Sequence, residues 1–188
     1  MKIQKVFTVI AFVMMAGASQ FINAQGMEKT VMVGGAAMYP SKNIIQNAVN
    51  SKDHTTLVAA VKAAGLVETL EGAGPFTVFA PTNAAFNKLP KGTVENLLKP
   101  ENKAMLSGIL TYHVVAGKYD SKALSAMIKK GGGKAELTTV NGQKLTVKME
   151  GGKVTVTDAK GGKAIVTTPD VYQSNGVIHV TDAVSMPK

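Results

Sequence analysis

The sequence contains no cysteine and no tryptophan, and all 21 of its basic residues are lysines. Without cysteine there is no disulfide, no thiolate metal site and no cysteine nucleophile, and folding does not depend on an oxidising compartment. Lysine is a point charge rather than a bidentate fork, and aromatic residues make up only 5% of the chain. Base readout by arginine and stacking of single strands on aromatic platforms are therefore both disfavoured. We expect no nucleic-acid partner.

Length and composition favour one globular domain with an additional segment. The chain has 188 residues, and 45% of them are hydrophobic, which argues against a disordered chain. A typical domain has about 150 residues, and a chain of this size buries about 70% of its unfolded surface. No internal repeat is visible.

Residues 1–24 have the pattern of a secretory signal peptide. Lys2 and Lys5 provide the positive start, Val6–Ala18 is a 13-residue and nearly apolar run, and Ala24 is a small residue before a cleavage site. The alternative, a membrane anchor, needs about 20 apolar residues. We therefore predict cleavage near Ala24, no transmembrane span in the mature chain, and a secreted product that is periplasmic or extracellular.

The rest of the chain divides into an N-terminal lead-in and one domain. Residues 25–42 contain three methionines, a glycine pair and Pro40, and we interpret them as an extended linker. A soft copper site formed by these methionines is the alternative, but we favour the interpretation that the methionines cover the edge of the domain. The domain is expected over residues 43–187.

Within the domain, helical periodicity comes first and strand periodicity second. Helices are expected after Asn43, from the Asp53 cap to Gly65, and over 66–70, 83–89, 94–98 (capped by Thr93), 101–110 and 121–128 (capped by Ser121). Strands are expected over 76–80, 112–115, 137–140, 143–149, 153–158, 163–168 and 177–182. Asn141-Gly142 suits a two-residue type I′ turn. The order predicts an α+β fold rather than alternating βαβ units.

Three separated segments carry a recognisable pattern: 77–86 (TVFAPTNAAF), 112–115 (YHVV) and 175–182 (NGVIHVTD). In this order and spacing they closely resemble the fasciclin (FAS1) domain, and the similarity covers nearly all of residues 43–187. The resemblance implies a single-domain β-sandwich or wedge with a layer of short helices, in a secreted adhesion or matrix module rather than an enzyme. We call the segment 77–86 the first box and the segment 175–182 the second box. The residues that carry the pattern in these two boxes are Thr77, Phe79, Pro81, Thr82, Asn83, Phe86, Asn175, Gly176, His179 and Asp182.

The histidines of these segments are expected to be structural. In a strand, Tyr112 and Val114 would lie on one face and His113 on the other. A zinc site would need further ligands, and only Asp170 and Asp182 lie near His179 in sequence. A hydrolytic triad of Ser174, His179 and Asp182 is also disfavoured, since no Gly-x-Ser-x-Gly elbow is present. We expect no catalytic residue, no metal and no cofactor.

Two kinds of partner contact follow from the sequence. The resemblance implies receptor contacts through Tyr112 and His113 and through the Asp170-Val171 pair, but we favour the simpler interpretation that Tyr112 and His113 are framework residues and Asp170 is a turn residue. Separately, residues 118–163 hold ten lysines and four acids. In this segment Lys144 and Lys148 lie on one face of a predicted strand and form a basic face. This face could adhere to anionic polysaccharide or lipid headgroups, but its simplest role is to keep an exposed sheet soluble.

The expected function is cell adhesion, or another non-covalent interaction at the cell surface or in the extracellular matrix. The partner would be a cell-surface or matrix component, either a protein or an anionic polysaccharide. Two alternatives stay open: a carrier of an apolar small ligand, and an envelope stress or signalling factor that acts through a protein partner. The sequence does not define the oligomeric state.

Overall fold

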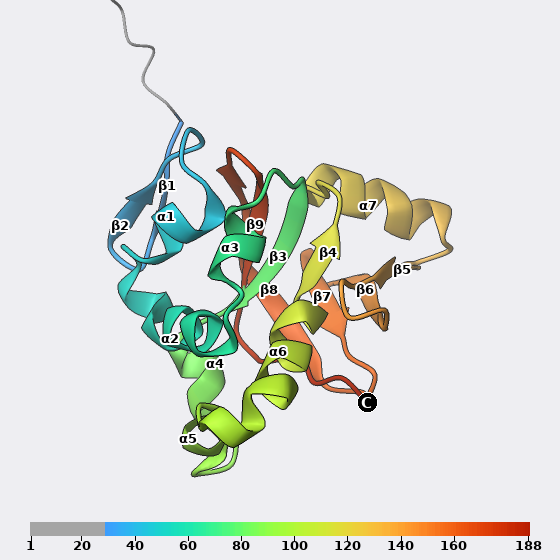
Figure 1. Cartoon of the computed structure of the whole chain (residues 1–188). Helices are drawn as coiled ribbons and strands as arrows, with labels where there is room; N and C mark the ends of the chain where they lie inside the picture. Colours follow the sequence, from blue (N-terminus) through green and yellow to red (C-terminus); the bar gives the residue numbers. More distant parts are fainter. Residues whose placement is uncertain (1–28) are drawn as a thin grey trace, which may run out of the picture.

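Strands β3 and β9 lie side by side and run parallel in the main sheet (Figure 1). The computed structural model describes residues 29–188, so the predicted signal peptide and its cleavage near Ala24 lie outside the described residues. Seven strands follow the order β4-β3-β9-β8-β7-β6-β5, and every neighbouring pair except β3–β9 is antiparallel. Their bounds are β3 Phe76–Pro81, β4 Val114–Ala116, β5 Lys134–Thr138, β6 Lys144–Glu150, β7 Lys153–Thr157, β8 Lys163–Gln173 and β9 Gly176–Thr181.

The two edges of this sheet meet. Val115 of β4 forms an antiparallel bridge with Thr139, and the Val140 amide donates to the Val114 carbonyl oxygen at 2.8 Å. The long strand β8 shifts register on both sides of Thr168, and such irregularities bend a strand and increase its twist. The sheet therefore curls into a wedge that is nearly closed.

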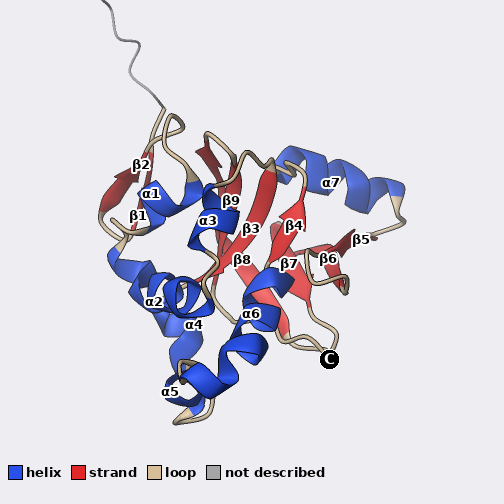
Figure 2. Ribbon diagram, viewed as in Figure 1, coloured by secondary structure: helices blue, strands red, loops and turns tan. Residues whose placement is uncertain are grey.

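Short helices cover the sheet on two sides (Figure 2). Six of them, with two 3₁₀ turns, pack against the β3–β9 side, and α7 lies over β5, β6 and β7. Their bounds are α1 Ile44–Ala48, α2 Thr55–Ala64, α3 Val67–Glu71, α4 Asn83–Asn87, α5 Thr93–Leu97, α6 Lys103–Tyr112 and α7 Ser121–Lys130, with the turns η1 Lys52–His54 and η2 Pro100–Asn102. The predicted α+β class is confirmed. In residues 29–188 no helix has the length and apolar character that a membrane crossing needs.

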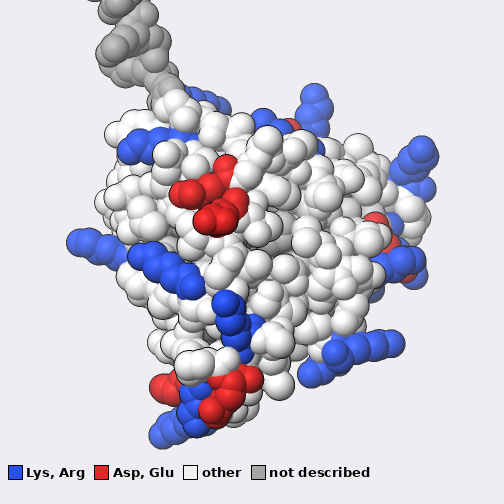
Figure 3. Space-filling model, viewed as in Figure 1, with Lys and Arg blue, Asp and Glu red and all other residues white. Residues whose placement is uncertain are grey.

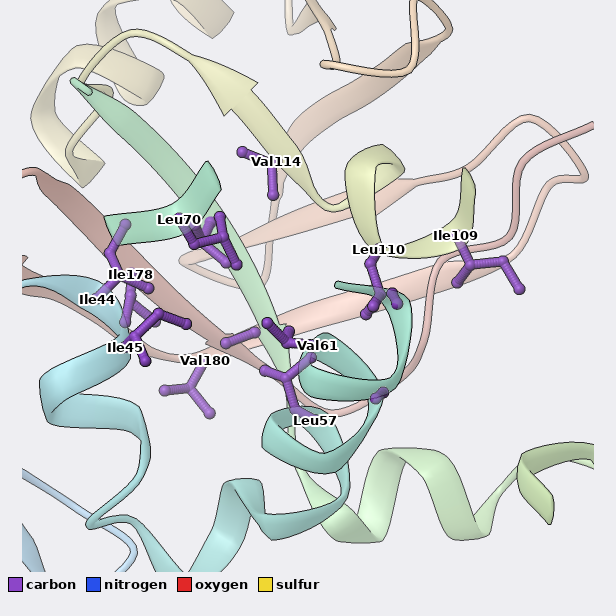
Figure 4. Packing of buried hydrophobic residues seen from close by; sticks show 14 of the residues in the cluster. Ile44, Ile45, Leu57, Val61, Leu70, Ile109, Leu110, Val114, Ile178 and Val180 are labelled. Atoms are coloured by element: carbon purple, nitrogen blue, oxygen red, sulfur yellow. The ribbon is translucent and has the colours of Figure 1, made fainter. Parts of the chain in front are cut away.

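The core consists of two apolar clusters on opposite faces of the sheet. In the first, α1, α2 and α6 direct side chains such as Ile45, Val61 and Leu110 toward Ile178 and Val180 of β9 (Figure 4). In the second, α7 packs on the inner face of β5–β8. The members of the second cluster include Leu124, Leu145, Val147 and Val156, which are all fully buried. Each such side chain contributes about 1.5–3 kcal/mol through burial.

Helix caps follow the expected chemistry at positions that differ partly from the predicted ones. Asn43 forms a capping box with Gln46 at the start of α1, and Thr82 accepts from the Ala85 amide at the start of α4. Asp120, rather than Ser121, caps α7. The predicted caps Asp53 and Thr93 are wrong, since Asp53 lies inside η1 and Thr93 is the first residue of α5.

The predicted strand over 112–115 is wrong at its start. Tyr112 is the last residue of α6 and His113 is its C-cap, so strand β4 begins at Val114. The strand alternation predicted for this segment does not apply. Instead, Tyr112 and Val115 belong to the cluster under α7, whereas Val114 belongs to the cluster under the other helices.

Two connections also differ from the sequence interpretation. Between β5 and β6 the Gly142 amide donates to the Thr139 carbonyl, and only Gly142 has a positive φ, of 84°. The turn is therefore centred on Val140 and Asn141, and it is not the predicted type I′ turn, in which Asn141 would also have a positive φ. In the predicted linker, strands β1 Val31–Val33 and β2 Ala36–Met38 form a hairpin. Its residues Val33 and Met38 are buried in the first cluster, so this part packs as an element of the fold.

Candidate functional site

The first sequence box joins β3 to the segments around it. Thr77, which is fully buried, donates to the Gly117 carbonyl at 2.7 Å and accepts from the Tyr119 amide at 2.8 Å. After β3 ends at the buried Pro81, the Asn83 side chain accepts from the Thr56 amide and donates to the Lys52 carbonyl. The remaining apolar members, Phe79 and Phe86, are buried. The box therefore fixes the position of the helical layer on the sheet.

The second box does the same from the start of β9. The Asn175 side chain accepts from the Ile44 amide at 3.0 Å and donates to the Leu70 and Gly72 carbonyls at 2.7 and 2.9 Å. It thus connects α1 and α3 across more than 100 residues of sequence. Next to it, a Cβ on Gly176 would lie 2.1 Å from the Phe76 carbonyl oxygen, so this position has no room for a side chain.

His113 is buried between α6 and the C-terminal segment. Its Nδ1 lies 2.8 Å from the Ile109 carbonyl oxygen, and its Nε2 accepts from the Ser185 amide at 3.0 Å. This pair of partners requires a neutral ring with the proton on Nδ1. Burial lowers the pKa of His113, which the Ile109 carbonyl and the Asp158 carboxylate oppose. The ring therefore acts as a fixed connector, as expected from the sequence.

His179 has the same role with the opposite tautomer. Its Nε2 lies 2.7 Å from the Tyr119 carbonyl oxygen, and its Nδ1 accepts from the Asp170 amide at 3.4 Å. The ring stacks on Phe79 with centroids 5.7 Å apart. Burial lowers its pKa against the effect of the Tyr119 carbonyl and of the Asp170 and Asp120 carboxylates. Both ring nitrogens are occupied, so neither is available to a metal or a substrate.

The geometry assembles neither a triad nor a metal centre from these residues. The Asp182 carboxylate accepts from the Ile165 amide at 2.7 Å and pairs with Lys88 at 3.2 Å, while His179 is held by main-chain groups. Burial acts to raise the pKa of Asp182, but these two partners outweigh it and the pKa is lowered. Within residues 29–188 no group of three histidine or acidic side chains is arranged to hold a metal ion.

The four residues expected to contact a receptor are mostly interior. Tyr112, His113 and Val171 expose 0%, 3% and 1% of their surface, so a direct contact through these side chains is incompatible with the folded state. Asp170 is partly exposed, but its two carboxylate oxygens accept from the amide and the hydroxyl of Ser121. Its φ of 59° is the only positive value among the non-glycine residues of the described chain. These residues connect β8 and α6 to their neighbours.

The lysines of the predicted basic face lie on the outer side of the sheet. Leu145 and Val147 point inward and are fully buried, while Lys144 is exposed and Lys148 is partly exposed. Lys144 forms an ion pair with Glu136 at 2.8 Å, and this hydrogen bond lowers the pKa of Glu136 and raises the pKa of Lys144. Lys148 instead lies directly opposite Lys134 on β5. Only Lys148 of the two predicted residues therefore has an uncompensated charge.

Sequence reasoning missed two connecting groups. The Asp158 carboxylate accepts from the Lys160, Gly162 and Met186 amides, and so ties the β7–β8 turn to the C-terminal segment. An aspartate shortly before a glycine pair is typical of such a turn and was the available signal. The second group, the buried pair of Ser51 and His54 with Oγ and Nδ1 2.9 Å apart, has no signal in the sequence.

Comparisons with known proteins agree with this architecture. The sequence profile of the Fasciclin domain matches residues 52–187. Protein sll1483 of Synechocystis sp. is 50% identical over 85% of this chain and 82% of its own length. Immunogenic protein MPT70 of Mycobacterium tuberculosis is 37% identical over 74% of this chain and 66% of its own. Human periostin is 31% identical over 76% of this chain but only 16% of its own.

A solved structure shows the same fold. The FAS1 domain pair of the insect cell adhesion molecule Fasciclin I superposes with a TM-score of 0.70 over 84% of this chain and 58% of that chain, at 19% sequence identity. The buried connectors and the curled sheet therefore form a known architecture, and the fold implied by the resemblance is confirmed. On the profile match and the similarity to the Synechocystis protein together, this chain belongs to the fasciclin domain family.

Proposed function

We propose that this protein is an exported, non-enzymatic adhesion module that binds anionic surface or matrix polymers through the outer face of β5, β6 and β7. We call this surface the lysine face and define it by Lys134, Lys148 and Lys153. The adhesive role of an insect relative supports the general class. The predicted signal peptide over residues 1–24 supports a place outside the cytoplasm, in the periplasm or beyond the cell.

The observation that carries the proposal is the register of β5 against β6. Lys134 and Lys148 are cross-strand partners, and like charges in such a pair destabilise the sheet. Among the described residues, no carboxylate lies within 4 Å of either ammonium group, whereas the neighbouring Lys144 and Lys163 are paired with Glu136 and Glu150. An anionic partner would relieve this repulsion, which makes the pair a natural contact point.

The position of the face also suits a contact surface. In Figure 3 lysine side chains project from the edge of the molecule formed by α7, β5 and β6. The buried side of the same strands is held by α7 and the second cluster, so the lysines lie on a rigid support. Each exposed charge contributes little alone, and useful affinity requires several lysines, or several copies of the protein, on one polymer.

The test compares two double variants with the same change of charge. Lys134→Glu/Lys148→Glu alters the lysine face, and Lys62→Glu/Lys91→Glu alters exposed lysines on the helical side. Binding of the full-length protein to immobilised alginate is measured over a range of salt concentrations. We expect the first variant to lose affinity and salt dependence and the second to retain most of both. Equal losses would show unspecific attraction to a basic protein, and binding by neither variant nor the native protein would exclude anionic polysaccharide.

A further inference from the structure

A cavity of about 60 Å³ lies between the helical layer and the β3–β9 side of the sheet. Its walls are formed by α1 and α2, by the strands, and by the end of α6, and Leu57, Val61, Leu110 and Ile178 in Figure 4 belong to them. None of its lining residues, which all lie within residues 29–188, carries a carboxylate or an ammonium group. The cavity is thus an apolar space inside the first cluster.

One polar group in this wall lacks a partner. His54 is 4% exposed, its Nδ1 is paired with the Ser51 hydroxyl at 2.9 Å, and its Nε2 has no hydrogen-bond partner among the described residues. The Ala80 main chain lies close enough to raise the pKa of the ring as a hydrogen-bond partner, but this contact is too poorly aligned to satisfy Nε2. Buried polar atoms are almost always satisfied, so this nitrogen indicates a missing partner.

The hydrogen bonds of Ser51 and His54 define which chemical group the missing partner must supply. The Ser51 hydroxyl has no other acceptor among the described groups, so it donates to Nδ1 of His54. A neutral imidazole that accepts at Nδ1 carries its proton on Nε2. Burial lowers the pKa of His54, against the opposing effects of the Ala80 backbone and the Asp53 carboxylate, which agrees with a neutral ring. His54 therefore presents one N–H donor, and its partner must supply an acceptor.

Water does not fill this role well. A buried water needs two to four polar partners, and the other polar side chains of the wall are occupied or exposed. His113 has partners on both nitrogens, and the Thr111 hydroxyl donates to the Ser107 carbonyl at 2.7 Å. An apolar cavity of about 150 Å³ accepts a benzene molecule. The cavity of about 60 Å³ is smaller than this, so it has room for only the terminal group of a ligand.

The cavity opens toward the surface, so a longer ligand can extend outward. The lining residues with exposed surface include Leu66, Thr69, Phe76, Thr111 and Val140. In Figure 3 the surface bounded by α3, β4 and α6 shows no charged side chain. An apolar tail therefore leaves the cavity without passing a charge.

We propose that this cavity binds the carbonyl end of a small neutral apolar molecule, such as a methyl ketone, with the His54 Nε2–H donating to the carbonyl oxygen. A carboxylate does not fit, because a neutral histidine cannot compensate a buried charge in this wall. The site is separate from the lysine face, so its test does not depend on the proposed adhesive function.

The test uses a ligand pair that differs in one group. The full-length protein is titrated with 2-hexanone and with 2-methyl-1-hexene, in which a methylene group replaces the carbonyl oxygen. In His54→Phe we expect affinity for the ketone to fall roughly tenfold, the equivalent of one hydrogen bond, while affinity for the alkene changes less than about threefold. The ketone alone should shift the His54 Nε2–H resonance of the native protein in ¹H–¹⁵N NMR spectra.

A second variant protects the test against a folding defect. Val61→Phe fills the cavity from α2 and should abolish the binding of both probes while leaving His54 in place. The NMR shift in the native protein remains informative even if His54→Phe does not fold. The proposal is overturned if neither probe binds at its solubility limit, if His54→Phe weakens both probes equally, or if Nε2 shows a bound water that the ketone does not displace.

Discussion

The Tyr112 hydroxyl donates to the main-chain carbonyl oxygen of Lys144 at 2.9 Å. The Tyr112 hydroxyl oxygen in turn accepts from the Ala159 amide at 3.0 Å. The last residue of α6 is therefore joined both to the first residue of β6 and to the β7–β8 turn. Burial, in part opposed by the Ala159 amide, raises the pKa of Tyr112, so the phenol stays protonated. Two residues that the sequence presented as partner contacts are thus linked inside the molecule, one through its side chain and the other through its backbone.

Removal of this hydroxyl should weaken the fold. In Tyr112→Phe the ring still fills its site, but the Ala159 amide and the Lys144 carbonyl lose their partner, and we expect a loss of about 1–3 kcal/mol. Urea unfolding followed by circular dichroism measures it. The matched control is Tyr39→Phe at a half-exposed ring, which should change stability by less than about 0.5 kcal/mol. Similar values for the two variants would show that the Tyr112 hydroxyl makes no specific contribution.

The sequence predicted the elements better than their junctions. The Thr77–Phe86 box was recognisable because Pro81 ends a β-rich run and Thr82 suits a helix start. The junction at Tyr112 was not, since a short run of Tyr, His and Val is compatible with both a helix end and a strand. The decision depends on the partners that His113 finds at Ser185, 72 residues away.

The sequence pattern revealed the candidate sites only in part, because these sites also depend on contacts between residues that are distant in the sequence. Alternation correctly placed Lys144 and Lys148 outside and Leu145 and Val147 inside. However, the register that pairs Lys144 with Glu136 and sets Lys148 against Lys134 depends on the turn, which the sequence interpretation assigned incorrectly. The cavity at His54 depends on packing between α2 and the distant strand β9, which no local pattern encodes.

Two glycines should respond in opposite ways to substitution by alanine. In Gly176→Ala the new Cβ would lie 2.1 Å from the Phe76 carbonyl oxygen, so the parallel β3–β9 pair must shift, and we expect a loss of more than about 3 kcal/mol. In Gly108→Ala no atom lies within 4 Å of the Cβ, and α6 gains about 0.5–1 kcal/mol from helix propensity. Thermal unfolding compares them. Tolerance of Gly176→Ala would contradict the close approach of β3 and β9.

Asp170 should hold the start of α7 against strand β8. Its φ of 59° is costly for a residue with a side chain, and its carboxylate compensates by accepting two hydrogen bonds from Ser121. We expect Asp170→Ala to lose about 2–3 kcal/mol and to increase hydrogen exchange in the first turn of α7. Asp170→Asn keeps one acceptor and tolerates this φ, so its loss should be smaller. Unchanged exchange at α7 in both variants would show that Asp170 does not anchor the helix.

Stability should fall as the medium becomes mildly acidic. His54, His113 and His179 each have a pKa that burial lowers from 6.5. Below about pH 6.5 the unfolded chain therefore binds protons that the folded protein does not, and the free energy of unfolding decreases as pH falls toward the folded-state pKa values. Each histidine contributes up to about 1.4 kcal/mol per pH unit in this window. Well above pH 6.5 the three rings are neutral in both states, and their contribution is complete and constant.

Urea unfolding between about pH 7.5 and 5.5, a range in which ordinary carboxylates stay ionised, measures this slope. His179→Gln is the control, since an amide side chain can donate to the Tyr119 carbonyl and accept from the Asp170 amide as the imidazole does, but does not titrate. The slope reports the number of protons taken up on unfolding, and in this variant that number should be smaller by about one than in the native protein. An identical slope in both proteins would mean that His179 binds a proton as readily in the folded as in the unfolded state, which contradicts a ring nitrogen held as acceptor of the Asp170 amide.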